Sequence, residues 1–468
     1  MSEGSDSDRY DDPIDENDNA LDYLRDSEWP LTTLASLVDE FQDSSEPNTQ
    51  DLVLCDAELV GALKALKLDP EVVQPKLSMG REWRRLYTDA IVLRCLNILI
   101  ENSEQRAGDP SSPKEDSSKA DSTTWEQAIR LLDQAIVLAG APGERRLELV
   151  LSCISYIQYW HLPYQVSESN LSDAPERPTG PVLATSPVPA IDPAPPVSAF
   201  SQLAQRPFVL PGFAATWPAI SCWTSREYLR SSGGRGRIVP IERGGDYRTD
   251  DWSVDLMPWD EFLESIKWGE NAQTRESDEE HKVYLAQHSL FTQFPKLRAD
   301  IEVPDYVYTE PGTCTFASSH YGGPPGNEEQ LVINAWCGGQ GANSPAHTDP
   351  YHNIYVQAVG YKLVWLAPPE ATPGMYAFNS ASPGENKPKT DRDPKREGML
   401  GNTSSLDVFS LSQAEGNENS SHPAFKEHAL PHAQSIMLGP GDALVIPPGW
   451  WHAMRGIGGG SFSVSFWF

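Results

Sequence analysis

A cluster of prolines divides this chain of 468 residues into two parts with different sequence patterns. Eight prolines lie between Ser167 and Ser201: Pro175, Pro178, Pro181, Pro187, Pro189, Pro193, Pro195 and Pro196. Proline fixes φ and has no backbone N–H, so this density excludes a packed helix or an inner strand. We therefore expect residues 166–200 to form an extended linker between two domains.

The part after the prolines, residues 201–468, consists of short β-like runs separated by Gly and Pro turns. The runs are RPFVLPGF, GRIVPIERG, QLVINAWCG, NIYVQAVGYKLVWLAPP, SIMLGPGDALVIPPGWWHAM and SFSVSFWF. Because no long helical pattern separates them, they predict a β-sandwich or barrel. Residues 379–419 are rich in Ser, Asn, Pro and Lys, and we expect them to be a surface insertion outside the functional site.

The part before the prolines shows helical periodicity and a strongly acidic beginning. Between residues 51 and 165, three runs place apolar residues at spacings of three and four: REWRRLYTDAIVLRCLNILIEN, TTWEQAIRLLDQAIVLAG and GERRLELVLSCISYIQYW. They predict a helical domain. Residues 1–51 contain sixteen Asp and Glu but two Arg, a net charge of −14. A block of this kind repels itself, so residues 1–50 are expected to be a disordered acidic arm.

The overall charge and the cysteines restrict the class of protein. A net charge of −31 argues against binding to nucleic-acid phosphates and favours a basic protein or peptide as the partner. The six cysteines include no C-x-x-C pair, which is typical of free thiols in a reducing compartment. With no signal-peptide pattern and no apolar run of roughly 20 residues, we expect an intracellular protein, nuclear or cytoplasmic, without a membrane segment.

The motif SPAHTDPYHN suggests a metal site. His347 and Asp349 are two residues apart, so on a strand both side chains would project from the same face. A His-x-Asp pair alone is common by chance. However, His452 ends the strand-like run GDALVIPPGWWH and would complete a set of two histidines and one carboxylate. This facial triad leaves positions open on Fe(II) for a cosubstrate and O2.

A lysine in an apolar run supports the same interpretation. Lys362 lies fifteen residues after His347, within NIYVQAVGYKLVWL. A buried ammonium in such a run requires an anionic partner. The distal carboxylate of 2-oxoglutarate would provide one, whereas exposure of Lys362 on an edge strand is the alternative.

Together these motifs resemble the jumonji-C (JmjC) family of Fe(II)- and 2-oxoglutarate-dependent oxygenases. SPAHTDPYHN, GYKLVWLAPP, GDALVIPPGWWH and SFSVSFWF are similar to its catalytic core. RPFVLPGFAATWPA, IVPIERGGDYRTDDWSVDLMPWDEFLE, YLAQHSLF and LVINAWCGGQGANSPAHTDP resemble the branch called jumonji domain-containing protein five or lysine-specific demethylase eight. The resemblance runs from about Arg206 to Phe468 and departs around 370–425. It implies an α+β chain whose double-stranded β-helix (a jelly-roll, cupin-like catalytic domain, 201–468) follows a helical domain.

The resemblance also implies roles for individual residues. His347, Asp349 and His452 match the iron ligands and catalytic residues of the family. The positions matching its 2-oxoglutarate pocket are Tyr284, Ser344, Asn353, Lys362, Trp336 and Trp467. Glu242 and Trp252 match residues that receive a substrate arginine, and a carboxylate opposite an aromatic face is a chemically apt guanidinium site.

Three functions remain open from the sequence. The site chemistry favours hydroxylation of an arginine side chain in a protein, with 2-oxoglutarate and O2 consumed at Fe(II). The naming of the branch favours demethylation of a histone methyl-lysine. A catalytically silent cupin-like binding module is the third, and the intact triad together with Lys362 argues against it.

Overall fold

The computed structural model describes two compact units of the chain. The described residues are 74, 80–81, 84–85, 87–95, 98, 117–143, 145–164, 177–244, 246–249, 251–269, 283–310, 320–378, 400–413 and 422–468. One unit comprises residues up to Gln165 together with Gly234–Ile238, and the other comprises Val166–Gly233 and Val239–Phe468. The acidic arm predicted at 1–50 lies outside the described residues.

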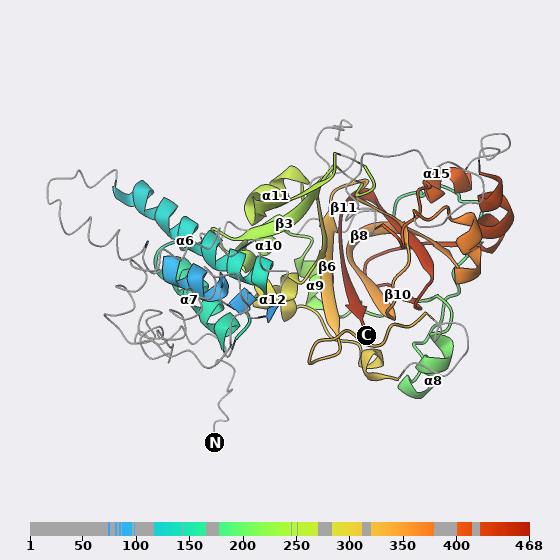
Figure 1. The fold of residues 1–468 in the computed structure, drawn as a ribbon, viewed down its shortest axis with the longest axis horizontal. Coiled ribbons are helices and arrows are strands. Elements are labelled where there is room, and N and C mark those ends of the chain that lie inside the picture. The colour runs from blue at the N-terminus through green and yellow to red at the C-terminus, as the bar shows by residue number, and fades with distance from the viewer. Residues whose placement is uncertain are drawn as a thin grey trace, which may run out of the picture. The chain divides into compact units, whose positions relative to one another are not determined.

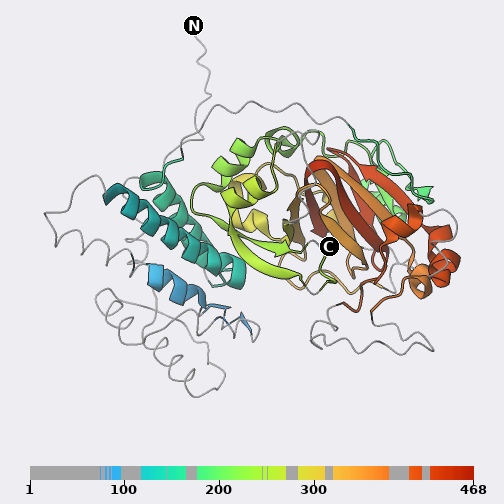
Figure 2. The ribbon, with the colours of Figure 1, turned by 90° about the horizontal axis from the view of Figure 1, so that it is seen from above.

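The first unit is helical. Helical residues occur between 81 and 98, followed by α6 (Ser117–Ala139) and α7 (Arg146–Trp160), which lie side by side in Figures 1 and 2. The inward face of α7 follows the helical repeat, since Leu149, Val150, Cys153, Ile154 and Ile157 are all buried. Among the described helices, none is long and apolar enough to cross a membrane.

The second unit is built on a mixed β-sheet of eleven strands (Figure 1). In chain order the strands are β1 (Ser186–Pro187), β2 (Phe208–Leu210), β3 (Ile238–Arg243), β4 (Ser253–Pro258), β5 (Val283–His288), β6 (Val332–Gly338), β7 (Asn343–His347), β8 (Asn353–Ala367), β9 (Gln434–Leu438), β10 (Ala443–Ile446) and β11 (Trp451–Trp467). The helices are α8 (Val197–Leu203), α9 (Pro218–Cys222), α10 (Arg226–Gly233), α11 (Trp259–Ser265), α12 (Leu290–Gln293), α13 (Pro295–Arg298) and α15 (Val408–Gln413), with the short turns η3 (Asp305–Tyr308), η4 (Pro369–Gly374), η6 (Phe425–Ala429) and η7 (Leu430–His432).

The two longest strands, β8 and β11, run through both halves of the barrel. The first half of β8 pairs with β10, and its second half pairs with β9. Similarly, the first half of β11 pairs with β7, and its second half pairs with β6. All these pairs are antiparallel, and β8 and β11 pair with each other along most of their length. The α+β prediction with a jelly-roll domain is therefore confirmed.

The alternation in SFSVSFWF determines which face of β11 is polar. Its serines point to one side of the sheet, whereas Phe462, Val464 and Phe466 join the large apolar core on the other side. There Phe462 lies 4.3 Å from Trp223, ring centre to ring centre. The helices before β6 therefore cover the outer face, which leaves the serine side facing the barrel interior.

The segment expected to be an extended linker, 166–200, contributes to the sheet in its described part. Residues 186–187 form β1, which pairs in parallel with β9, and α8 begins at Val197. Prolines are accommodated because the backbone N–H groups of Ser186 and Val188 make the bonds to the neighbouring strand, to Ala433 O and Ser435 O. Pro187, between them, occupies an edge position where no N–H is needed.

Candidate active site

The predicted metal ligands come together at one end of the barrel. His347 is the last residue of β7, and its register partner on β11 is His452. The Nε2 atoms of His347 and His452 lie 3.9 Å and 3.5 Å from the carboxylate oxygens of Asp349. Among the residues that the structure describes, these three form the group of His, Cys, Asp or Glu ligand atoms close enough for one ion, with all atoms within 4.8 Å.

Asp349 reaches the site from a loop and not from a strand. Because β7 ends at His347, the expected strand alternation does not apply to Asp349. Its backbone carbonyl instead accepts a hydrogen bond of 2.8 Å from Gly449 N, in the PPG turn just before β11. The turn that precedes His452 thus also holds Asp349 in place.

Hydrogen bonds orient both imidazoles toward the ion position. The Nδ1 atom of His347 lies 2.8 Å from Pro345 O, and that of His452 lies 3.0 Å from Trp450 O. A carbonyl oxygen can only accept, so each Nδ1 must bear the proton of the neutral ring. Each Nε2 lone pair is then directed toward Asp349, as metal-binding histidines require.

The surroundings favour the charge states of metal ligands. Burial, with a further contribution from His452, lowers the pKa of His347. Burial alone would raise the pKa of Asp349, but the interactions with His452 and His347 hold it below its usual value. Neutral imidazole and ionised carboxylate are the forms that bind a divalent ion.

Lys362 lies in the interior, and among the described residues it has no anionic hydrogen-bond partner. Its side chain is 1% exposed, and its Nζ donates to the hydroxyls of Tyr284 at 3.1 Å and Tyr355 at 2.5 Å. Both hydroxyl groups are uncharged, so they do not compensate the charge of the ammonium. Burial consequently lowers the pKa of Lys362 to about 7. The predicted burial is observed, and a carboxylate bound beside the ammonium would restore its charge.

A bulge in the barrel brings Lys362 and Tyr355 to the same face. They are seven residues apart on β8, and regular alternation would place them on opposite faces. Gly360, between them, has φ +74°, and the register with β11 shifts at this point. A Cβ at Gly360 would lie 2.1 Å from Gly460 O, so the close approach requires glycine there.

The other residues expected in the 2-oxoglutarate pocket line the same interior. Ser344 hydrogen bonds to Tyr284, and Trp336 Nε1 donates to Ser465 Oγ at 2.9 Å. Trp467 is the register partner of Asn353. The buried Asn353 Oδ1 and Trp467 Nε1 have no hydrogen-bond partner among the described residues.

One interior amide was missed by the sequence analysis. Asn334 on β6 is 3% exposed, and its Nδ2 likewise has no partner in the described structure. Because Asn334 is paired with Ser465, two residues from Trp467, it shares their face. The pattern NAW, with Trp336 two residues later, would have indicated this. A buried ammonium and unpaired polar atoms fit a small polar anion, so the residues present are compatible with a dicarboxylate.

Glu242 and Trp252 also lie together, beside Tyr284. Glu242 on β3 is the register partner of Tyr284 on β5. At Gly244, φ is +94°, and an added Cβ would lie 3.1 Å from Trp252 Cα, so the chain returns closely to this point after β3. Burial raises the pKa of Glu242, a hydrogen bond with Trp252 lowers it, and the charge of Asp246 raises it. None of these influences is cationic, which leaves the carboxylate suited to a positively charged ligand.

The predicted surface insertion at 379–419 is partly wrong. Residues 402–406, which we call the flanking segment, run along β7: Thr403 forms a β-bridge with His347, and Ser404 N donates to Ala346 O at 2.8 Å. Leu406 and the following apolar residues are buried against β7 and β11. Apolar side chains within the polar stretch thus anchor it beside the metal ligands, whereas residues 379–399 and 414–421 lie outside the described part.

Comparisons with known proteins show which family the chain belongs to. Residues 197–468 match the family model described as a cupin-like domain. A Danio rerio protein named lysine-specific demethylase 8 is 28% identical over 407 residues, which is 84% of each chain. A Xenopus tropicalis protein of the same name is 34% identical, and the Drosophila melanogaster Jumonji C domain-containing protein 5 is 33% identical. Each of these two matches 56% of this chain, which spans about half of their own length, 48% and 55%.

Proposed function

This chain belongs to the cupin-like domain family, with JmjC-domain proteins among its relatives, and we propose that it is an Fe(II)- and 2-oxoglutarate-dependent oxygenase that hydroxylates an arginine side chain of a protein. The observation that supports the enzyme class most strongly is the triad of His347, Asp349 and His452. The buried Lys362, joined through Tyr284 to Ser344 of β7, adds to it. When bound, Fe(II) and 2-oxoglutarate supply oxidation of a C–H bond by O2, with release of succinate and CO2.

The triad would hold the ion through two neutral imidazoles and one carboxylate. Pro345 O and Trp450 O keep the Nε2 lone pairs directed to a common point, so the ligands need no reorientation on binding. Three protein ligands on one side leave the remaining coordination positions to the cosubstrate and O2. The low exposure of His452, 3%, keeps water from this side of the site.

Lys362 would bind and orient the cosubstrate. Its ammonium can pair with a carboxylate, while Tyr284, Asn353 and Ser344 provide hydroxyl and amide groups for the remaining oxygen atoms. We assign Lys362 no proton-transfer role, since a buried charge that pairs with a substrate carboxylate must remain protonated. Trp336 and Trp467 would form the walls of the same pocket.

The arginine specificity rests on Glu242 and Trp252. A half-buried carboxylate with a raised pKa gains from a cation, and a guanidinium can also stack on the indole. Glu242 neighbours Tyr284, which contacts Lys362, so a side chain bound there would lie next to the proposed cosubstrate pocket. The net charge of −31 further favours a basic partner.

The names of two relatives favour a second reaction, demethylation of a methyl-lysine. To separate the two, peptides with arginine or methyl-lysine would be incubated with the full chain, Fe(II) and 2-oxoglutarate, and analysed by mass spectrometry. An added oxygen on arginine is expected, whereas loss of a CH2 unit from methyl-lysine would replace this proposal with the second. If no peptide gave succinate above the His347→Ala control, the silent binding module would be correct.

A further inference from the structure

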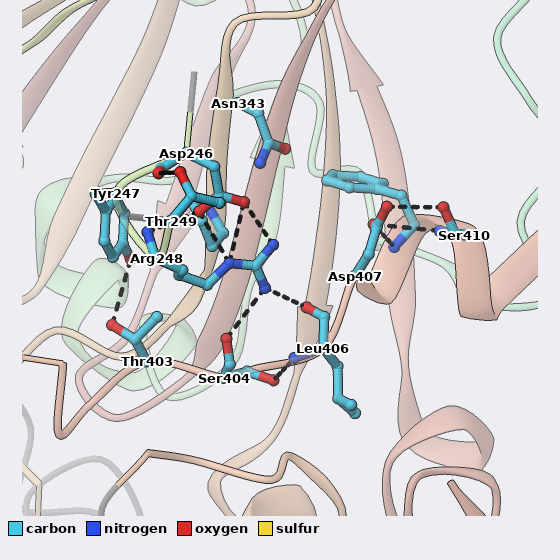
Figure 3. Close-up of polar contacts among 12 residues, drawn as sticks. Asp246, Tyr247, Arg248, Thr249, Asn343, Thr403, Ser404, Leu406, Asp407 and Ser410 are labelled. Atoms are coloured by element: carbon cyan, nitrogen blue, oxygen red, sulfur yellow. Dashed lines mark hydrogen bonds and ion pairs between the residues drawn. The ribbon is translucent and has the colours of Figure 1, made fainter. Parts of the chain in front are cut away.

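The turn that follows β3 is attached to the flanking segment by two side chains, Arg248 and Tyr247 (Figure 3). Arg248 Nη1 donates to two backbone carbonyls of this segment, Ser404 O at 3.2 Å and Leu406 O at 2.7 Å. The other edge of its guanidinium holds Asp246, with Nε 2.9 Å from Oδ1 and Nη2 2.6 Å from Oδ2. The Arg248 side chain is 14% exposed, so these bonds are largely shielded from water.

Asp246 makes the turn itself rigid. Its Oδ1 accepts from Arg248 N at 2.9 Å, and its backbone carbonyl accepts from Thr249 N at 3.1 Å and from Thr249 Oγ1 at 2.7 Å. Trp252 N then donates to Thr249 O at 3.4 Å. The position of Trp252 therefore depends on this turn, which Arg248 attaches to the flanking segment.

The other side of this connection is the metal site. The flanking segment is bonded to β7 through Thr403 and Ser404, next to His347. Tyr247, within the turn, lies 3.3 Å from Thr403 Oγ1, hydroxyl oxygen to hydroxyl oxygen. Burial raises the pKa of Tyr247, and the nearby charge of Asp349 adds a smaller contribution. Two side chains thus connect the turn, through the flanking segment, to the end of β7 at His347, and Arg248 makes more of these bonds than Tyr247.

We propose that Arg248 is a positioning residue that fixes the Glu242–Trp252 substrate site relative to the metal ligands, without touching substrate or metal itself. This inference rests on the proposed function. The guanidinium is needed because its fork of donors can reach a carboxylate and two carbonyls at once, which an ammonium cannot reproduce. We call the bonds from Arg248 to Asp246, Ser404 O and Leu406 O the clamp. Loss of the clamp would let the substrate side chain move relative to the oxidising centre.

Arg243 provides a matched control. It lies next to Glu242 on β3 but on the opposite face, where it forms an exposed ion pair with Asp255 at 3.3 Å. Arg243→Gln and Arg248→Gln remove the same charge from the same hairpin. For a basic peptide, loss of positive charge alone would strengthen binding. A weakening seen in Arg248→Gln alone therefore reports positioning and not net charge.

The test measures peptide KM, kcat, 2-oxoglutarate KM and the ratio of succinate to hydroxylated peptide, using the full chain with Fe(II). We expect Arg248→Gln and Arg248→Lys to raise peptide KM about tenfold and to increase the ratio of succinate to hydroxylated peptide. A small displacement of the substrate side chain lets 2-oxoglutarate be consumed without hydroxylation of the peptide. The 2-oxoglutarate KM should stay unchanged, and Arg243→Gln should leave peptide KM unchanged or slightly lower.

Three results would overturn the inference. The first is equal behaviour of the Arg248→Gln and Arg243→Gln proteins, and the second is full activity of Arg248→Lys. The third is a parallel loss of iron, 2-oxoglutarate and peptide binding, which would indicate general destabilisation. If Arg248→Gln does not fold, the isosteric variant Asp246→Asn replaces it in the test. A raised peptide KM is then expected, and an unchanged peptide KM would contradict the clamp.

Failure of the proposed function would be recognised separately. In that case the wild-type protein itself would form no succinate with any peptide. Hydrogen exchange of the amides at 246–249 would then test the clamp directly, without substrate. Faster exchange is expected in Arg248→Gln than in Arg243→Gln, and equal rates would refute the inference.

Discussion

Replacing Lys362 by methionine should stabilise the protein at low pH when no 2-oxoglutarate is bound. Burial lowers the pKa of this lysine from 10.5 to about 7, a difference of about 3.5 units. At roughly 1.4 kcal/mol per unit, the folded state disfavours the ammonium by about 5 kcal/mol. The substitution also removes the hydrogen bonds to Tyr284 and Tyr355, at about 1 kcal/mol each. Below pH 7, Lys362→Met should therefore raise the free energy of unfolding by about 3 kcal/mol.

The advantage of the variant should disappear as the pH rises. Between pH 7 and 10.5 the unfolded lysine retains its proton while the folded one has lost it, so unfolding takes up a proton. The free energy of unfolding of the wild type consequently rises with pH in this window, by about 1.4 kcal/mol per unit, and is independent of Lys362 below it. At this slope, about two pH units offset the difference of about 3 kcal/mol, so the two proteins should become equally stable near pH 9.

Urea unfolding of both apoproteins between pH 6 and 9.5 measures this difference. Other titrating groups are common to the two proteins and cancel in the comparison. Lys296→Met is the matched control, because Lys296 is exposed and its replacement makes the same chemical change at the surface. A constant difference between wild type and Lys362→Met, or a variant that is less stable at pH 6, would refute the burial of an uncompensated ammonium.

Four other predictions follow from the same structure. The affinity for 2-oxoglutarate should fall as the pH rises above about 7, by up to tenfold per pH unit, because the bound carboxylate requires protonated Lys362. Calorimetry of the wild type would show this, and equal affinity at pH 7 and 9 would contradict it. His347→Ala should abolish turnover and bound iron but leave the circular dichroism spectrum unchanged, as activity and metal content will show. Glu242→Gln should raise peptide KM at least about tenfold while 2-oxoglutarate KM stays constant, and equal loss of both would indicate a structural role. Gly360→Ala should lower the melting temperature strongly, since its φ is positive and its Cβ would collide with Gly460 O, whereas a normal melting curve would exclude the bulge.

The sequence by itself determined the fold class, and it indicated a candidate metal triad whose three residues the structure brings together. Alternation in SFSVSFWF and the apolar β8 region depend on the two-residue repeat of a strand, a local property that the sequence shows directly. The pair of His347 and Asp349, with His452 at a strand end and Lys362 in an apolar run, indicated a metal triad because two histidines and one carboxylate are the ligand set of a facial iron site. The proline cluster marked a change in pattern, although it did not reveal that Pro187 lies at a sheet edge.

The tertiary structure decided how these residues meet. Lys362 reaches Tyr355 because the bulge at Gly360 reverses the alternation of β8, and a bulge depends on the neighbouring strand as well as on the strand itself. The flanking segment, polar in sequence, lies beside His347 because a few apolar side chains find a partner surface on distant strands. The bonds from Arg248 to Ser404 O and Leu406 O join residues more than 150 positions apart, to backbone atoms that every residue type possesses. No sequence motif identifies such acceptors, because only the folded chain determines which carbonyl groups lie within reach of a given side chain.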